Sequence, residues 1–199
     1  MQPVNEISFD SLELLSEKTL FVFALPSEAA EEFEHVNKVF VGIGKVNAAY
    51  ELTSAIRKHK PQLIINLGSA GSNFFKRGEV ICCTKFIQRD MDVRGLGFKL
   101  YETPFSNIDP LLNYGIKIKG LPEGVCGSGD SFEMNHSVSD YDVIDMEAYP
   151  LAYISMMENI PFLCLKYISD GADGTAADDW AVQVHNAATA FRKILFPPG

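Results

Sequence analysis

Apolar residues along the chain form short runs that are mostly continuous, and stretches with helical spacing lie between these runs. Continuous apolar runs are typical of strands that are covered on both faces. Such runs predict strands at 19–25, 38–43, 62–69, 79–87, 124–128 and 161–169. Apolar residues at helical spacing predict helices at 45–60, 145–159 and 176–195. This alternation predicts an α/β fold with a mixed, mostly parallel central β-sheet flanked by helices.

The composition agrees with a single globular domain. The chain has 199 residues, of which 47% are hydrophobic and 22% are charged, so it can bury a sizeable core. We see no internal repeat, low-complexity tract or linker in the sequence. We therefore expect one domain over residues 1–199, with fraying at 1–15 and 196–199.

Charge and cysteine content narrow the expected partners and location. The net charge of −9 opposes binding to phosphate backbones and anionic lipid, so we expect neither nucleic acid nor a membrane as a partner. The N-terminus has no cationic segment before an apolar core, and no apolar run approaches the ~20 residues of a membrane span. The four cysteines lack zinc-type spacing, which favours buried thiols and no metal site. These features predict a cytoplasmic protein.

Small and polar residues follow several of the predicted strands. The sequence PSE follows the first strand, GKVN follows the second, and GSAGS ends the third. Loops at the carboxyl ends of parallel strands converge on a ligand crevice. GIGKVN does not match a dinucleotide fingerprint, because Asn47 occupies the third glycine position. The glycines indicate either close approach of a ligand to the backbone or tight packing of strand against helix.

Three carboxylates fall at this predicted edge of the sheet: Glu28, Glu147 and Asp170. Each alone fits a structural role, because acidic residues cap helices and stabilise their first turns. Carboxylates that share a partly apolar crevice repel one another and acquire raised pKa values, which suits general acids and bases. Their joint position therefore predicts a catalytic site.

Several motifs together resemble those of a known enzyme family. GIGKVNAA, INLGSAGS followed by GEV, GSGDSF, VIDMEA and PFLCLKYISDGAD occur in the order typical of the nucleoside phosphorylase superfamily. They are most similar to the 5′-methylthioadenosine/S-adenosylhomocysteine nucleosidases, over about residues 20–173. The resemblance implies a nucleoside phosphorylase-like fold and an N-ribosyl hydrolase. Such an enzyme cleaves the purine–ribose bond of 5′-methylthioadenosine, S-adenosylhomocysteine or a related 5′-substituted adenosine to give free adenine. It also implies a homodimer and no cofactor.

The resemblance assigns a role to each of the three carboxylates. Asp170 is the acid at the purine N7, Glu147 binds the ribose hydroxyls, and Glu28 handles the attacking water. The chemistry agrees, because positive charge grows on the sugar and negative charge on the departing purine as the bond breaks. The division of labour also resembles that of glycoside hydrolysis.

Further positions are expected to bind the substrate. By resemblance, Phe132 stacks near the base, the backbone of Glu133 reads the adenine edge, Met146 lies against the sugar, and Ser69 lies near the water. The full expected set of substrate-binding residues is Ile43, Ser69, Val93, Arg94, Leu96, Phe132, Glu133, Met146 and Ser169.

Residues 88–98 resemble the segment that crosses the family's dimer interface and lines the 5′-substituent pocket of the partner. Val93 and Leu96 keep its apolar character, whereas Arg94 adds positive charge. Arg94 either is simply solvated or meets an anionic group on the 5′ side of the substrate. The lone Trp180 is either a lid over the ligand or a core anchor.

The sequence favours water over phosphate as the nucleophile. Phosphorylases of this superfamily keep an arginine just ahead of the GS motif, where this chain has Asn66 and Leu67. They also place cations after the first strand, where this chain has Glu28. The alternatives are a purine nucleoside phosphorylase, a hydrolase for futalosine or a nucleotide, and a nucleoside-binding protein without turnover.

Overall fold

The computed structural model describes residues 6–7, 17–133, 136–172 and 176–197, and the side chains of 6, 7, 176–182, 184 and 185 are not described. We expected fraying at 1–15 and 196–199. Of these residues, only 6–7, 196 and 197 are among those described, so the rest of that prediction lies outside the described residues. The side chain of Trp180, considered above as a lid, also lies outside them.

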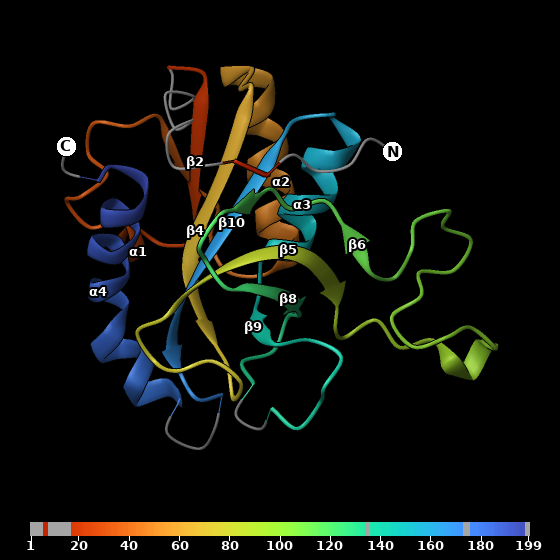
Figure 1. The fold of residues 1–199 in the computed structure, drawn as a ribbon. Helices are drawn as coiled ribbons and strands as arrows, with labels where there is room; N and C mark the ends of the chain where they lie inside the picture. The colour runs from red at the N-terminus through yellow and green to blue at the C-terminus, as the bar shows by residue number, and fades with distance from the viewer. Residues whose placement is uncertain (1–5, 8–16, 134–135, 173–175, 198–199) are drawn as a thin grey trace.

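The central sheet closes on itself. Its order is β10-β5-β8-β9-β4-β2-β3, and β10 also pairs with β4, so that β4, β10, β5, β8 and β9 form a ring (Figure 1). Parallel pairings join β2 to β3 and β4, β4 to β10, and β8 to β5 and β9. Antiparallel pairings join β5 to β6 and β10, and β4 to β9. The strands are β2 (Thr19–Phe23), β3 (Lys38–Phe40), β4 (Leu63–Gly71), β5 (Val80–Gln88), β6 (Leu112–Asn113), β8 (Glu123–Ser128), β9 (Val143–Asp145) and β10 (Phe162–Asp170).

Helices cover the sheet on two sides. Helices α2 (Lys45–His59) and α3 (Ala148–Met157) lie on one side, and α4 (Ala176–Leu195) lies on the other (Figure 1). The short helix α1 (Pro26–Ala29) contacts α4. A two-stranded sheet pairs β1 (Glu6–Ile7) with β7 (Lys117–Ile118), and a 3-10 helix spans Arg94–Leu96.

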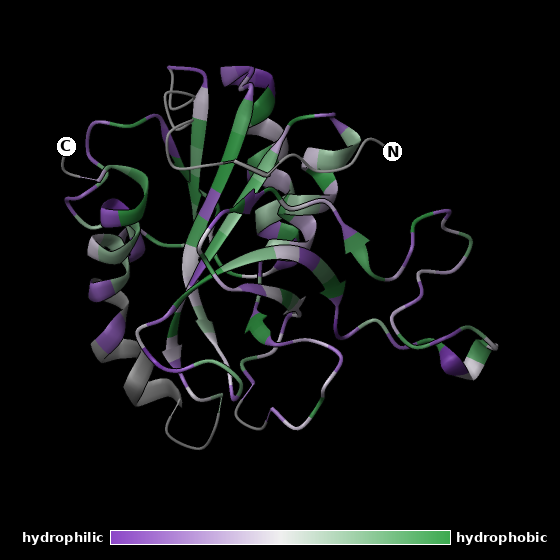
Figure 2. Ribbon diagram, in the orientation of Figure 1, coloured by the Kyte–Doolittle hydropathy of each residue, from purple (hydrophilic) through white to green (hydrophobic). Residues whose placement is uncertain are grey.

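Two hydrophobic clusters account for the continuous apolar runs of the sequence. One lies between the sheet and helices α2 and α3, and the other lies between the sheet and α4. Figure 2 shows that the central strands are largely hydrophobic. All nine residues of β10 are buried, because neighbouring strands and both clusters surround it. Such burial on both faces selects a continuous apolar run.

The mixed α/β architecture expected from the sequence is confirmed, and two details differ. The segment 145–159 was expected to be helical throughout, but Val143–Asp145 forms β9 and the helix begins at Ala148. The ring closure of the sheet was not predicted, because it depends on pairings between strands distant in sequence. Within the described part of the chain, no helix is both long enough and apolar enough to cross a membrane.

Candidate active site

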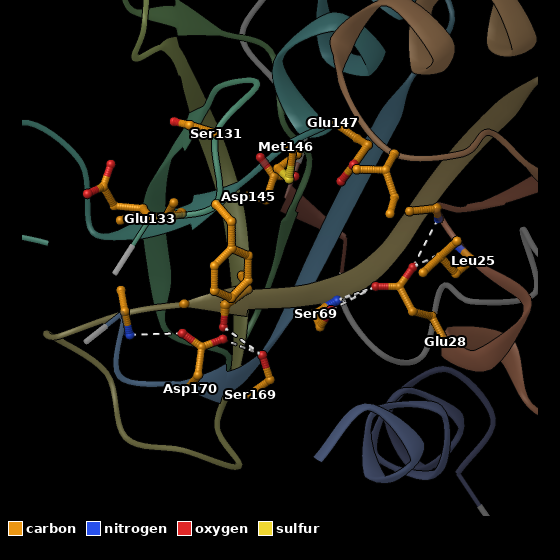
Figure 3. Close-up of a pocket in the computed structure, with 17 residues that line it drawn as sticks. Leu25, Glu28, Ser69, Ser131, Glu133, Asp145, Met146, Glu147, Ser169 and Asp170 are labelled. Atoms are coloured by element: carbon orange, nitrogen blue, oxygen red, sulfur yellow. Dashed lines mark hydrogen bonds between the residues drawn. The ribbon is translucent and has the colours of Figure 1, made fainter. Parts of the chain in front are cut away.

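A cavity of about 430 Å³ lies at the carboxyl ends of β2, β4, β9 and β10. Parallel strands bring their carboxyl ends to one edge of a sheet, which is where ligands bind in folds of this kind. Figure 3 shows carboxylates directed toward this space from different elements. The cavity is lined by Ala24, Leu25, Glu28, Ile43, Ser69, Ala70, Gly71, Ser131, Phe132, Glu133, Ile144, Asp145, Met146, Glu147, Ser169, Asp170 and Ala172.

Glu28 is held in a fixed position by four hydrogen bonds. Its Oε2 accepts from the backbone N–H groups of Ala24 at 3.0 Å and Leu25 at 3.1 Å. Its Oε1 accepts from the N–H of Ser69 at 2.8 Å and from Ser69 Oγ at 2.9 Å. Since a carboxylate offers about four lone-pair sites, these donors occupy the acceptor capacity of Glu28. These four contacts therefore hold the Glu28 carboxyl group between β2 and β4.

Asp170 ends β10 beside a second hydroxyl. Its Oδ1 accepts from the N–H of Ala172 at 2.8 Å, and its Oδ2 lies 2.8 Å from Ser169 Oγ. Ser169 Oγ also lies 3.3 Å from the carbonyl of Ala70. A Cβ atom on Gly71 would lie 2.7 Å from Asp170 Oδ1, so the glycine of GSAGS is required for the close approach of β4 to this carboxylate.

Glu147 lies at the start of α3, and its Oε1 accepts from the N–H of Gly44 at 2.9 Å. The side chain is buried, and this burial, reinforced by the neighbouring Asp145 carboxylate, raises the pKa of Glu147 to about 8. Gly44 has a positive φ of 91°, a conformation that glycine adopts without strain. The glycines of GIGKVN thus bring the backbone close to a carboxylate of the site.

A buried ion pair that was not predicted from the sequence lies beneath the cavity. Lys166 Nζ lies 2.8 Å from Asp145 Oδ2, and both side chains are almost fully buried. Burial opposes the charge on Asp145, but the Lys166 ammonium outweighs it and keeps the pKa of Asp145 below its usual value. The signal was present in the sequence, because Lys166 is a charged residue inside the apolar run of β10. Its partner could be identified only from the fold.

The structure brings nine of the twelve sequence-predicted site residues to this cavity. The nine lining residues are Glu28, Ile43, Ser69, Phe132, Glu133, Met146, Glu147, Ser169 and Asp170. Ile43 and Phe132 are about half exposed, so they lie at the mouth of the cavity rather than within the core. The roles assigned to these residues remain predictions.

Val93, Arg94 and Leu96 do not line the cavity of their own chain. Figure 1 shows the segment between β5 and β6 extending away from the sheet. Arg94 is exposed and donates to both carboxylate oxygens of Asp92, at 2.8 Å and 2.6 Å. These residues were expected to line the 5′-substituent pocket of a partner in a dimer, so their contact with substrate stays a prediction.

The described residues contain no cluster of histidine, cysteine and acidic side chains suited to a metal ion.

The protonation of Glu147 predicts a pH-dependent contribution to stability. In the folded chain Glu147 ionises near pH 8, whereas its ordinary pKa is 4.5. The folded chain therefore binds more protons between these values, and the stability that Glu147 contributes below pH 4.5 is lost as the pH rises to 8. We expect Glu147→Gln to raise the melting temperature relative to wild type more at about pH 8.5 than at about pH 5. Thermal unfolding of both proteins measures this, with the exposed Glu158→Gln as control.

A family model described as "Phosphorylase superfamily" matches residues 32–196. The chain belongs to this superfamily. Among curated members, it is 34% identical over 159 residues to the 5′-methylthioadenosine/S-adenosylhomocysteine nucleosidase of an Exiguobacterium species, covering 68% of this chain and 67% of that protein. It is 30% identical over 156 residues to the nucleosidase of the same name from Haemophilus influenzae, covering 68% of each chain.

Two solved structures share the fold of this chain. A mutant of the Helicobacter pylori nucleosidase, with 5′-methylthioadenosine in its active site, matches with a TM-score of 0.80 and 21% identity, over 90% of this chain and 96% of that chain. The futalosine hydrolase of the same organism matches with a TM-score of 0.80 and 20% identity, over 92% of this chain and 97% of that chain. The expected nucleoside phosphorylase-like fold is thereby confirmed.

Proposed function

We propose that the protein is an N-ribosyl hydrolase that cleaves the purine–ribose bond of 5′-methylthioadenosine, S-adenosylhomocysteine or a related 5′-substituted adenosine, without a metal or organic cofactor. The observation that carries this proposal is the convergence of three buried carboxylates, Glu28, Glu147 and Asp170, on one cavity. The named activity of the curated relatives supports it. We also propose that the central sheet, which contains both parallel and antiparallel pairings, is mostly parallel.

On the base side, Asp170 acts as the general acid. A protonated Asp170 donates to the purine N7, which neutralises the negative charge that develops on the departing adenine. Ser169 Oγ lies between the carbonyl of Ala70 and Asp170 Oδ2. When Asp170 loses its proton, the Ser169 hydroxyl can turn its own proton toward the new carboxylate and stabilise it.

On the sugar side, Glu147 and Met146 bind the ribose. Glu147 is mainly protonated below about pH 8 in the free protein. It can therefore donate a hydrogen bond to a ribose hydroxyl or accept one from it. The thioether of Met146, which also lines the cavity, provides an adaptable apolar surface for the sugar.

On the water side, Glu28 orients and deprotonates the nucleophile. Its four acceptor positions are all occupied in the free protein, two of them by Ser69. The Ser69 hydroxyl can rotate without backbone movement, and a bound ribose offers it another acceptor. We infer that this rotation frees one position on Glu28 Oε1 for the attacking water.

The lining of the cavity favours water over phosphate. Of the described residues that line it, none is lysine, arginine or histidine. A phosphate dianion would meet Glu28 without a cation among the lining residues to balance it, which is unfavourable in a partly buried site, and the nearby Lys166 is already paired with Asp145. Asn66 offers no substitute, because it is buried and its Nδ2 donates to the carbonyl of Val22. A phosphorylase is therefore the weaker alternative, as is a nucleoside-binding protein, which needs no acid and base.

The first test is release of free adenine from 5′-methylthioadenosine by the purified protein in phosphate-free buffer. We expect release that does not change when phosphate is added, and we expect the sugar product to be 5-methylthioribose rather than its 1-phosphate. Release that requires phosphate would establish the phosphorylase alternative. Release of the purine base from futalosine or a 5′-anionic nucleotide, with none from 5′-methylthioadenosine, would keep the hydrolysis and change the substrate.

We further propose a cytoplasmic homodimer whose partner completes the 5′ end of the site. Val46 and Tyr50 on α2 are exposed, and Ile43 lies beside them in the chain at the cavity mouth. An exposed apolar surface next to a ligand site is typical of an interface. In this arrangement Val93, Arg94 and Leu96 of one protomer approach the cavity of the other, where Arg94 would favour an anionic 5′ group.

A further inference from the structure

The loop that follows β8 forms one wall of the cavity. Its residues Ser131, Phe132 and Glu133 line the cavity, and residues 129–133 belong to no helix or strand. The conformation of this wall therefore depends on contacts from other parts of the chain. Several of these contacts come from the turn that follows β5, at Arg89 and Asp90.

Arg89 lies beneath the loop with a side chain that is only 5% exposed. Its guanidinium donates to the backbone carbonyls of Gly129 and Ser131, and to Ser131 Oγ at 3.1 Å. Its Nη1 also lies 3.4 Å from Glu133 Oε2, with which it forms an ion pair. One planar group thus contacts three residues of the loop, a geometry that the single ammonium of lysine cannot reproduce.

Gly129 allows this close contact. A Cβ atom at position 129 would lie 2.9 Å from Arg89 Cζ and 3.1 Å from Arg89 Nε, so any side chain there would displace the guanidinium. The Nε atom is buried and has no hydrogen-bond partner among the described residues. One N–H donor of the guanidinium thus stays unpaired within the described part of the chain, and its contacts with the loop determine where the guanidinium lies.

Asp90 holds the same loop from its other side. Asp90 Oδ2 accepts from the N–H of Asp130 at 2.9 Å, and Asp90 Oδ1 pairs with Lys45 Nζ. Asp130 Oδ1 in turn accepts from the N–H of Lys45 at 2.7 Å, which joins the loop to the start of α2. These contacts fix the beginning of the loop, whereas Arg89 reaches the residues that line the cavity.

We propose that Arg89 is a positioning residue that holds the 129–133 loop in the conformation that binds the base of the nucleoside. It also keeps the Glu133 carboxylate paired at the edge of the site: Figure 3 shows this carboxylate directed away from Asp170 and Glu28. Without the guanidinium, an unpaired carboxylate could turn into the space that the base occupies. This inference rests on the proposed function, because it assigns the loop to a purine.

The test compares Arg89→Ala, Arg89→Lys and Gly129→Ala with wild type, and uses the exposed Arg57→Ala as control. Two quantities are measured: the Kd for free adenine by calorimetry, and KM and kcat for 5′-methylthioadenosine. Because Arg89 is not among the residues that line the cavity, we expect Arg89→Ala to raise Kd and KM about tenfold or more and to change kcat by less than about threefold. Gly129→Ala should have the same effect, Arg89→Lys an intermediate one, and Arg57→Ala none.

A double variant distinguishes positioning from general damage. If Arg89 and Gly129 act through one contact, Arg89→Ala/Gly129→Ala should be no weaker in adenine binding than the more affected single variant. A lower melting temperature with unchanged KM and adenine Kd would show a merely structural role and overturn the proposal. Should Arg89→Ala fail to fold, Gly129→Ala and Arg89→Lys provide the comparison.

Failure of this inference can be separated from failure of the proposed function. If wild type releases adenine and the variants keep its KM and adenine Kd, the function stands and the positioning role is overturned. If wild type binds adenine but releases none, the function fails, and weaker adenine binding by the variants still supports the positioning role. If wild type neither binds nor releases adenine, both are overturned.

Discussion

Replacing Asp170 with asparagine is expected to lower kcat/KM for adenine release about a thousandfold, because the amide cannot give a proton to the purine N7. The substitution keeps the shape of the side chain. Its Oδ1 can still accept from the N–H of Ala172, and its Nδ2 can donate to Ser169 Oγ. We therefore expect little change in melting temperature and a KM close to that of wild type. Steady-state kinetics in phosphate-free buffer measure the effect.

The matched control for Asp170 is Asp140→Asn, an exposed aspartate outside the cavity. We expect its kinetics to equal those of wild type. A substrate whose base leaves without protonation provides a second comparison, because Asp170→Asn should then cost much less. Equal losses on both substrates would contradict the role of Asp170 as the acid.

Replacing Glu28 with glutamine is expected to lower kcat about a hundredfold to ten-thousandfold while KM changes by only a few fold. The reason is that an amide cannot take a proton from water. Glutamine also has one oxygen where Glu28 has two, so its NH2 group must face donors that now bond to a carboxylate, either Ala24 and Leu25 or Ser69. Besides the lower kcat, we therefore expect the free energy of unfolding to fall by about 1–3 kcal/mol.

Two measurements separate these effects of Glu28→Gln. Denaturant unfolding gives the stability, and kinetics well below the melting temperature give the loss of turnover. The exposed Glu31→Gln, from the same turn of the chain, is the control and should match wild type in both. If adenine affinity falls as much as kcat, Glu28 acts in binding rather than on the water.

Hydrophobic patterning and strand-end chemistry were sufficient to predict much of the site. The buried strands of the core appear in the sequence as continuous apolar runs, because strands covered on both faces exclude polar residues. Glu28 follows one such run and Asp170 ends another, and a sheet brings the carboxyl ends of its parallel strands together. The three carboxylates were therefore expected to lie together, and they line one cavity.

Only the tertiary structure determined how these parts are supported. The ring closure requires β10 to pair with β4, and β9 with both β8 and β4, which no local pattern encodes. Lys166 was visible in the sequence as a charge in an apolar run, but its pairing with Asp145 joins two strands. The hydrogen bond from Arg89 to the carbonyl of Gly129 likewise joins segments that are distant in sequence. Local periodicity reports which residues are buried, whereas the partner of a buried charge depends on contacts formed only when the whole sheet assembles.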